Sequence, residues 1–201
     1  ELLMLLEIGL RCNDASLTRD NTIVGDPTEG ALVVAGKKAF LNFDEKRIDE
    51  IPFDSGRKMM STVYKINGKN LVFVKGAPEA ILSQCSEIFE NGKTKILVSE
   101  KRKEILKVSQ ELSSKAYRML GFAFKQVNSL DRKDFENKLV FVGLVAMRDP
   151  PRENVKEAIA LCSQAGINVK MITGDNALTA EAIAEKLGFQ NIKSISGEEL
   201  E

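Results

Sequence analysis

Residues 59–75 have the sequence MMSTVYKINGKNLVFVK, and this stretch decides the fold of the chain. Two strand-like runs, Met59 to Ile66 and Asn70 to Lys75, are rich in β-branched and aromatic residues. The Asn67-Gly68 dipeptide between them accepts the positive φ angles of a tight turn. The stretch therefore predicts an antiparallel β-hairpin.

Helices and further strands are predicted on both sides of the hairpin from apolar spacing and turn residues. Thr28 is a plausible N-cap for the second helix, and Asn91-Gly92 marks a second hairpin turn. The predicted helices span residues 2–10, 29–41, 78–85 and 99–116, further strands span 118–127 and 138–147, and 13–16 and 19–21 are expected to form loops.

The pattern changes at Pro150-Pro151. A helix over 153–165, a strand over 167–172 and a helix over 177–187 are typical of a parallel α/β sheet, but they are too few for a complete domain. We therefore predict an α/β (α+β) chain. Residues 1–148 form a domain with an antiparallel sheet and flanking helices, and residues 149–201 form a partial α/β domain.

Composition excludes several classes of function. The 29 Lys and Arg balance 29 Asp and Glu, so there is no general attraction to nucleic acid or to an anionic membrane. The chain has no histidine, which excludes Ser-His-Asp and Cys-His catalysis and most zinc sites. The apolar run Leu139 to Met147 is far shorter than the roughly twenty residues of a membrane helix.

The three cysteines, Cys12, Cys85 and Cys162, are widely spaced and form no Cys-x-x-Cys pair. This spacing predicts buried free thiols in a reducing, cytoplasmic compartment.

A candidate phosphate site follows the predicted strand at 167–172. Thr173, Gly174 and Asp175 lie where a strand would end and a helix begin, and backbone N–H groups and a hydroxyl at such a place can hold a phosphate. A simple turn with a helix cap is the alternative.

A candidate base and phosphate pocket lies around the central hairpin. Lys75 is at a strand end, and Gly76 lets a ligand approach the backbone. Phe53 precedes a flexible turn with Lys58, a combination suited to stacking on a base beside phosphate-seeking cations. The alternatives are a solvated lysine at 75 and a core phenylalanine at 53.

Glu29 is a further candidate, because a carboxylate near a base can accept a hydrogen bond from an exocyclic amine. Helix capping by Asp26 and Glu29 would also explain both residues.

Taken together, these motifs resemble the cytoplasmic part of P-type cation-transporting ATPases, most closely the calcium-pump branch. The resemblance covers essentially the whole chain, as a nucleotide-binding domain followed by part of a phosphorylation domain of haloacid-dehalogenase-like fold. It rests on residues 25–32 (GDPTEGAL), 52–61 (PFDSGRKMMS), 75–79 (KGAPE), 149–152 (DPPR) and 171–176 (MITGDN).

The resemblance implies a role for each motif. Phe53 would stack on adenine, Glu29 would hydrogen-bond near it, and Lys58, Lys75 and Gly76 would line the ATP pocket. Arg118 would reach the ATP phosphates. In the second domain, Thr173, Gly174 and Asp175 would contact the terminal phosphate, and the interdomain hinge would comprise Asp149, Pro150, Pro151 and Arg152.

The resemblance also implies what lies elsewhere in the parent protein. The family nucleophile, an aspartate in Asp-Lys-Thr-Gly-Thr, is absent here, as is the Gly-Asp-Gly-x-Asn-Asp segment that helps to hold Mg²⁺. The chain is thus expected to bind ATP without turnover, to contain no catalytic residue or metal site, and to begin after the phosphorylated aspartate.

The parent would use ATP and Mg²⁺ to transport a cation, Ca²⁺ by branch resemblance, as an integral membrane protein. The partners of this cytoplasmic part would be ATP and the rest of the same polypeptide, and not nucleic acid.

Three alternatives remain open at this stage. A non-catalytic nucleotide-sensing or interaction module could use the same pocket, and its gene would lack the aspartyl-phosphate motif and the membrane helices. A soluble haloacid-dehalogenase-type phosphatase would rest on residues 173–175 alone. An unpaired sheet edge could also join two copies of the chain.

Overall fold

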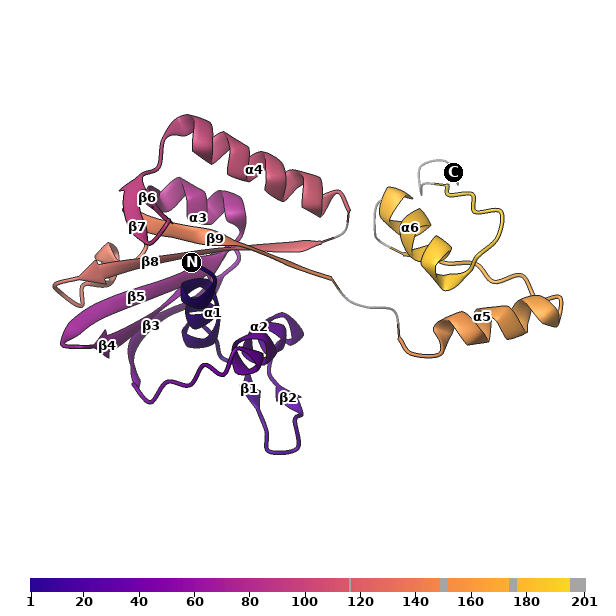
Figure 1. Cartoon of the computed structure of the whole chain (residues 1–201), viewed down its shortest axis with the longest axis horizontal. Coiled ribbons are helices and arrows are strands. Elements are labelled where there is room, and N and C mark those ends of the chain that lie inside the picture. Colours follow the sequence, from indigo (N-terminus) through magenta and orange to yellow (C-terminus); the bar gives the residue numbers. More distant parts are fainter. Residues whose placement is uncertain (116, 149–151, 174–176, 196–201) are drawn as a thin grey trace. The chain divides into compact units, whose positions relative to one another are not determined.

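The computed structural model describes residues 1–115, 117–148, 152–173 and 177–195 (Figure 1). The chain divides into two compact units, which are described separately below. The first comprises Glu1–Ser109 and Met119–Val145, and the second comprises Gln110–Arg118 and Ala146–Glu201. The predicted domain boundary after residue 148 stays a prediction.

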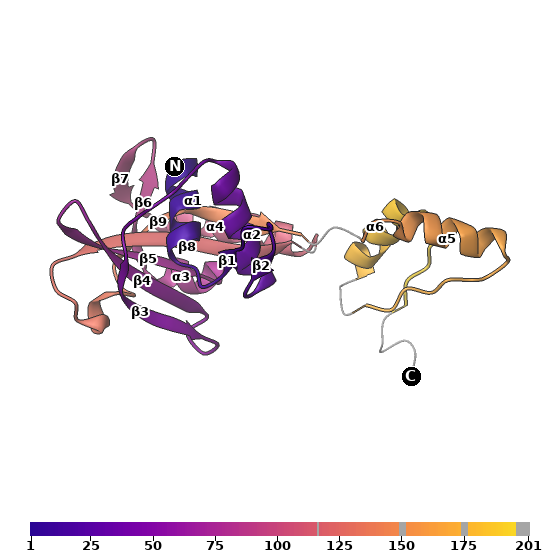
Figure 2. The same cartoon turned by 90° about the horizontal axis from the view of Figure 1, so that it is seen from below.

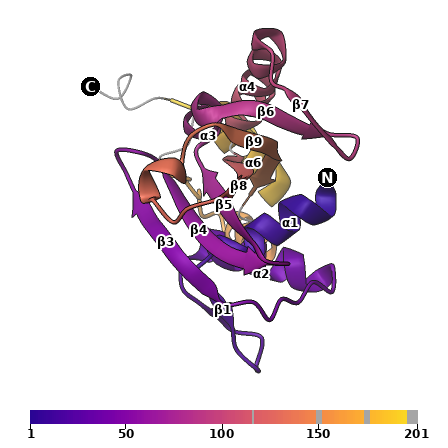
Figure 3. The same cartoon turned by 90° about the vertical axis from the view of Figure 1, so that its left-hand side faces the viewer.

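A large mixed sheet organises the first unit. Within the described residues it has seven strands in the order β3-β4-β5-β8-β9-β6-β7, which the end-on view in Figure 3 shows. The strands are β3 (Arg47–Asp54), β4 (Met59–Ile66), β5 (Lys69–Gly76), β6 (Cys85–Glu90), β7 (Lys93–Ile96), β8 (Arg118–Val127) and β9 (Leu139–Met147).

The prediction of a purely antiparallel sheet is wrong at one pair. Strands β6 and β9 run parallel, with Cys85 opposite Leu139 and Ile88 opposite Phe141. A parallel pair needs a crossover of a dozen or more residues, and the chain between Glu90 and Leu139 provides it. The other pairings that involve β3 to β7, including β5 with β8, are antiparallel.

The hairpin predicted from residues 59–75 is confirmed. Strands β4 and β5 pair without interruption from Met59–Gly76 to Ile66–Lys69. Asn67 and Gly68 have φ angles of 50° and 79°, as the tight turn requires. The second Asn-Gly turn has the same left-handed backbone at Asn91 and Gly92 and joins β6 to β7.

Helices cover both faces of the sheet, so its central strands are buried on both sides (Figures 1 and 2). Helices α1 (Leu2–Arg11) and α2 (Pro27–Lys38) lie on one face, and α3 (Pro78–Gln84) and α4 (Ser99–Ser113) lie on the other. Toward α3 and α4 the sheet presents Val63, Val72 and Val74 to an apolar cluster, which also includes Phe135 from the connection between β8 and β9.

The start of α2 differs in detail from the prediction. The helix begins at Pro27, and the Asp26 carboxylate caps it by accepting N–H bonds from Thr28 at 2.8 Å and Glu29 at 3.3 Å. Thr28 is therefore inside the helix and not its cap. Two short strands, β1 (Ser16–Leu17) and β2 (Ile23–Val24), also pair here, and of their residues Ser16 was expected to be in a loop.

The described part of the second unit contains α5 (Val155–Gln164) and α6 (Ala177–Leu187), both close to their predicted positions. Each helix is followed by a glycine with positive φ, Gly166 at 73° and Gly188 at 85°. The strand predicted over 167–172 is not formed. Strands are held by hydrogen bonds to a neighbouring strand, and in the described residues none pairs with this segment.

Among the described residues, no helix is both long enough and apolar enough to span a membrane.

Candidate functional site

A buried ion pair joins two of the predicted site residues, Lys75 of β5 and Glu29 of α2. The Lys75 Nζ atom lies 2.5 Å from Glu29 Oε1, and the side chain of Lys75 is only 7% exposed. The other carboxylate oxygen of Glu29 accepts the backbone N–H groups of Asp14 at 3.0 Å and Ala15 at 3.1 Å. Lys75 is therefore not a solvated surface lysine. Glu29 does not only stabilise the start of its helix, because it also pairs with Lys75 and accepts two backbone N–H groups.

Phe53, unlike Lys75, is exposed to solvent. It lies near the end of the edge strand β3, and 62% of it is exposed. The alternative that Phe53 belongs to the core is thus wrong. An aromatic ring that is largely open to solvent can stack on another flat group.

The turn after Phe53 has a well-defined backbone. The Asp54 carboxylate accepts the N–H groups of Gly56 at 3.1 Å and Arg57 at 2.9 Å, and the N–H of Lys58 donates to the Asp54 carbonyl at 2.7 Å. Lys58 itself has a φ of 56°, in the left-handed region. These bonds fix the direction in which the chain leaves β3 and enters β4.

Glu136, which is far from this turn in the sequence, stabilises it through side-chain contacts. Its carboxylate pairs with the Arg57 guanidinium and accepts the Ser61 hydroxyl at 3.1 Å. Arg57 in turn donates through Nη2 to the carbonyl of Pro52 at 2.7 Å, directly before Phe53. Sequence reasoning missed Glu136, since it belongs to no motif and lies 79 positions from Arg57.

Gly76 is required by a close backbone approach. A Cβ atom at this position would lie 2.4 Å from the Lys58 carbonyl oxygen, which also accepts the N–H of Ala77 at 2.9 Å. The sequence suggested that Gly76 makes room for a ligand, whereas the contact that the structure provides is with its own chain. Nearby, the exposed Lys58 ammonium lies 3.2 Å from Glu79 Oε1.

Strand register brings several of these residues to one end of the sheet. Met60 is opposite Lys75, Met59 is opposite Gly76, and Asp54 is opposite Met59. This end lies away from the Asn67-Gly68 turn. We call the group gathered there the hairpin-end cluster, and it consists of Glu29, Phe53, Lys58, Lys75 and Gly76.

The other predicted site residues belong to the second unit. Arg118 is exposed and is the first residue of β8, Arg152 is exposed ahead of α5, and Thr173 is exposed in the segment without regular structure. Five further predicted residues lie outside the described residues, namely Asp149, Pro150, Pro151, Gly174 and Asp175.

The two buried cysteines, Cys12 and Cys85, do not offer a nucleophile. All three are free thiols, as predicted, although Cys162 is half-buried and not buried. Burial raises the pKa of Cys12 from 9.0 to about 11 and that of Cys85 from 9.0 to about 12. Both thiols therefore stay protonated near neutral pH.

The hairpin-end cluster offers binding groups without a reactive one. It combines an exposed ring, two ammonium groups and a carboxylate, and each ammonium is already paired with a carboxylate. Within the described residues, no group of three or more acidic or cysteine side chains lies close enough to hold a metal ion. Such a site suits recognition of an uncharged aromatic group with a phosphate nearby.

Comparisons with known proteins agree on one family. Residues 1–154 match the family described as "P-type ATPase, cytoplasmic domain N". Calcium-transporting ATPase 1 of Bacillus cereus is 46% identical over 193 residues, which cover 92% of this chain and 22% of that protein. Calcium-transporting ATPase 1 of Lactococcus lactis is 39% identical over 209 residues, covering 98% of this chain and 24% of that protein.

A cation-transporting ATPase of Synechocystis is 39% identical over 194 residues, covering 90% of this chain and 21% of that protein. The chain thus spans between a fifth and a quarter of the length of these relatives.

Proposed function

Because the chain belongs to the P-type ATPase family, through its cytoplasmic domain N, we propose that it binds the adenine nucleotide of a cation-transporting pump. Two relatives are named as calcium-transporting ATPases, so we propose Ca²⁺ as the transported ion. In the parent, an aspartate outside this chain would take the γ-phosphoryl group of ATP.

The observation that carries this proposal is the hairpin-end cluster, with Phe53 exposed beside a sheet end that also holds Lys58 and Lys75. An aromatic ring is worth about 1 to 3 kcal/mol when a base stacks on it. The turn bonds of Asp54 and the contacts of Glu136 fix the backbone on both sides of Phe53, so little ordering is needed on binding.

The buried pair would give the site its preference for adenine. Each carboxylate oxygen can accept two hydrogen bonds, so Glu29 has capacity left for an exocyclic amine after its contacts with Lys75, Asp14 and Ala15. Guanine presents a carbonyl where adenine presents that amine, and a carbonyl would meet the carboxylate oxygen unfavourably.

The phosphates would extend from this pocket toward basic groups. Lys58 is exposed at the same sheet end, and we propose that it approaches the phosphates on release from Glu79. Arg118 is proposed as a second phosphate contact. The described residues provide no cluster that fits Mg²⁺, so the ion would enter with ATP and be held by other parts of the parent.

The second unit is proposed to be part of the phosphorylation domain. In this proposal, residues 149–201 follow a haloacid-dehalogenase-like fold, and Thr173, Gly174 and Asp175 contact the terminal phosphate. Asp149, Pro150, Pro151 and Arg152 would form the hinge whose closure brings ATP to the nucleophile.

The test is a two-dimensional NMR titration of the chain with ATP and, in parallel, with GTP. We expect saturable ATP shifts centred near Phe53 and Lys75, with a dissociation constant from high micromolar to millimolar, on the order of 4 to 6 kcal/mol. Weaker shifts are expected for GTP. Absence of saturable shifts in a folded sample would refute nucleotide binding by this chain.

Two phenylalanine variants make the test specific. Phe53→Ala should weaken ATP binding about tenfold by removal of the stacking surface. Phe40→Ala is the matched control, since Phe40 is 94% exposed and follows α2 outside the cluster. Equal affinity in both variants would remove Phe53 from the site.

A further inference from the structure

The segment between α1 and β1 supplies the two backbone N–H groups that hold Glu29. Asp14 and Ala15 both donate to Glu29 Oε2, at 3.0 Å and 3.1 Å. Lys75 Nζ pairs with the other oxygen, Oε1. A carboxylate oxygen accepts about two hydrogen bonds, so the backbone fills Oε2, and Oε1 keeps one acceptor position. A residue that fixes this segment therefore also fixes the orientation of the Glu29 carboxylate.

The side chain of Asn13 fixes the segment. Asn13 is 6% exposed. Its Nδ2 donates two hydrogen bonds of 3.0 Å, one to the carbonyl of Gly9 in α1 and one to the carbonyl of Glu29 in α2. Its Oδ1 accepts the N–H of Ala15 at 2.8 Å. One buried amide thus joins the segment to the end of α1 and to the start of α2.

The groups around this side chain require an amide. Two carbonyls face its nitrogen and one N–H faces its oxygen, and among side chains of this length only Asn has both an NH₂ group and a carbonyl oxygen. The Ala15 N–H donates both to Asn13 Oδ1 and to Glu29 Oε2. The amide and the carboxylate are therefore held against one backbone group.

Arg47 of β3 contacts the same segment. Its Nη2 donates to the Asn13 carbonyl, and its Nη1 lies 2.6 Å from Asp14 Oδ1. The segment is thus tied to both helices by Asn13 and to the sheet by Arg47. Donors that are fixed in this way need little reordering when a ligand binds.

We propose that Asn13 is a positioning residue that sets the preference of the nucleotide site for adenine, an inference that rests on the function proposed above. Asn13 holds the Asp14 and Ala15 N–H groups on Oε2, so the exocyclic amine of adenine binds at Oε1, the oxygen that also pairs with Lys75. The side chain of Glu29 is 16% exposed, whereas Asn13 is buried and acts only through Glu29.

The test compares ATP with purine riboside triphosphate, which differs from ATP only in lacking the exocyclic amine. Both are titrated into the 201-residue chain and followed by NMR. The parent chain should bind ATP about tenfold more tightly than the analogue, as expected for a hydrogen bond to a charged group. In Asn13→Ala the two affinities should become nearly equal, because ATP binding weakens and analogue binding does not change.

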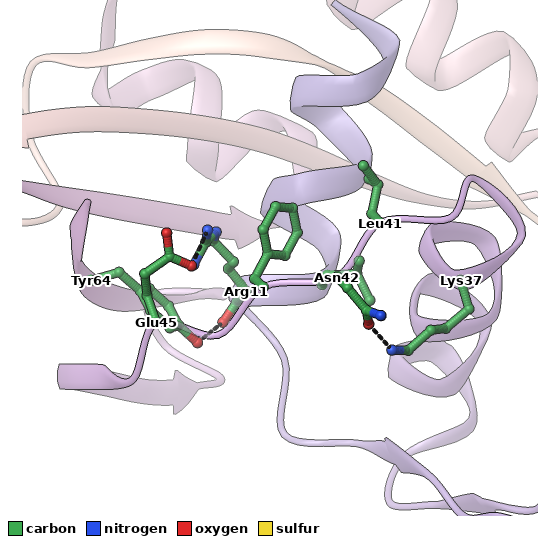
Figure 4. Close-up of a pocket in the computed structure, with 8 residues that line it drawn as sticks. Arg11, Lys37, Leu41, Asn42, Glu45 and Tyr64 are labelled. Atoms are coloured by element: carbon green, nitrogen blue, oxygen red, sulfur yellow. Dashed lines mark hydrogen bonds and ion pairs between the residues drawn. The ribbon is translucent and has the colours of Figure 1, made fainter. Parts of the chain in front are cut away.

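Tyr64→Phe is the matched control. The buried Tyr64 hydroxyl donates to the carbonyl of Arg11 at 2.8 Å, so this variant also removes a buried hydrogen bond at the end of α1 (Figure 4). Tyr64 lines a cavity of about 170 Å³ to which neither Asn13 nor the hairpin-end cluster contributes. Tyr64→Phe should lose stability and keep the preference of the parent chain for ATP over the analogue.

A second measurement uses the parent chain and does not depend on the folding of a variant. An amine bound at Oε1 draws electron density from the carboxylate and weakens the hydrogen bonds that Oε2 accepts. ATP should therefore shift the amide resonances of Asp14 and Ala15 more than the analogue does at equal saturation. If Asn13→Ala does not fold, these two resonances decide.

Three results would overturn this proposal while leaving nucleotide binding intact. The first is equal affinity of the parent chain for ATP and the analogue. The second is an Asn13→Ala variant that keeps the preference of the parent or loses affinity for both nucleotides equally, as a purely structural role predicts. The third is equal Asp14 and Ala15 shifts with both nucleotides. Absence of binding by either nucleotide would instead refute the proposed function, and this inference with it.

Discussion

The two faces of the main sheet differ in whether they bury charged side chains. Toward α3 and α4, the core is an apolar cluster that includes Val63, Val72 and Phe135. Toward α1 and α2, the molecule buries Arg11 and Lys75, the two charged side chains that are buried among the described residues. Strand β5 carries Val72 on the first face and Lys75 on the second, because alternate residues of a strand face opposite sides of the sheet.

This difference indicates that the buried charges serve ligand recognition more than they serve stability. Burial of an ion costs several kcal/mol even after relaxation, and a well-packed apolar pair is often at least as stable as a buried ion pair. Both faces bury apolar side chains that stabilise the fold, including Phe73 and Phe122 on the charged face, but among the described residues the charged face alone also keeps buried charges that a ligand could use. The buried pair of the hairpin-end cluster, Lys75 and Glu29, belongs to the charged face.

The largest expected effect comes from the apolar face. Leu139 of β9 is fully buried in this cluster, and Leu139→Ala should lower the free energy of unfolding by about 2 to 5 kcal/mol. Urea unfolding followed by circular dichroism measures this change, with Phe40→Ala as an exposed control. ATP affinity should stay unchanged under folding conditions, and a parallel loss of affinity would contradict the division between the faces.

On the charged face, removal of one partner should cost almost as much. Lys75→Met leaves Glu29 buried without its cation and should cost about 3 kcal/mol of stability. The double variant Lys75→Met with Glu29→Gln should recover most of that loss, because no charge is left unpaired. A double-mutant cycle in urea tests this, and additive losses would show that the pair does not act as a unit.

A smaller effect is expected at the start of α2. Asp26→Ala removes the acceptor for the N–H groups of Thr28 and Glu29 and should cost about 1 kcal/mol. Asp26→Asn keeps an equivalent acceptor and should remain near the parent stability. If both variants lose the same amount, charge and not the cap would be responsible. Thermal unfolding of the three proteins distinguishes these outcomes.

The smallest effect is expected from a surface ion pair between β3 and the connection that joins β8 to β9. Arg132 belongs to the short 3₁₀ helix at Arg132–Asp134, and its Nη2 atom lies 2.6 Å from Asp49 Oδ1. This hydrogen bond lowers the pKa of the Asp49 carboxyl below its usual range. A carboxyl with a lowered pKa adds stability above its unfolded pKa, and that contribution disappears as the pH falls through the folded pKa.

Asp49→Asn should therefore destabilise the chain slightly at neutral pH and not in strong acid. Urea midpoints of the variant and the parent across this pH range measure the difference. A gap between them that stays constant with pH would contradict an electrostatic origin.

Two elements formed by residues close together in the sequence were predicted correctly. The β4–β5 hairpin follows from turn chemistry at Asn67-Gly68, and α6 follows from apolar spacing and Gly188. Strand β3 was missed because Pro52 and several acidic residues hide its pattern, and its pairing with β4 stabilises it. The parallel β6–β9 pair was missed because nothing local encodes a contact across about fifty residues.

In the candidate site, too, contacts between residues far apart in the sequence could not be predicted. The motifs placed Phe53, Lys58 and Lys75 in one hypothesis, but the exposure of Phe53 and the burial of Lys75 could not be read from residue types. Glu136, which ties Ser61 to the turn, and Asn13, which links the end of α1 to the start of α2, carry no motif at all. Both depend on contacts between residues far apart in the sequence.

The position of β9 between β8 and β6 also has a consequence for synthesis on the ribosome. Until β9 emerges, the β3-β4-β5-β8 block and the β6-β7 hairpin have no strand to join them. At about 5 to 20 residues per second, translation from Ile96 at the end of β7 to Met147 at the end of β9 takes roughly 3 to 10 seconds. During that interval the nascent chain exposes two open sheet edges, and a chaperone that shields β6 would act in that window.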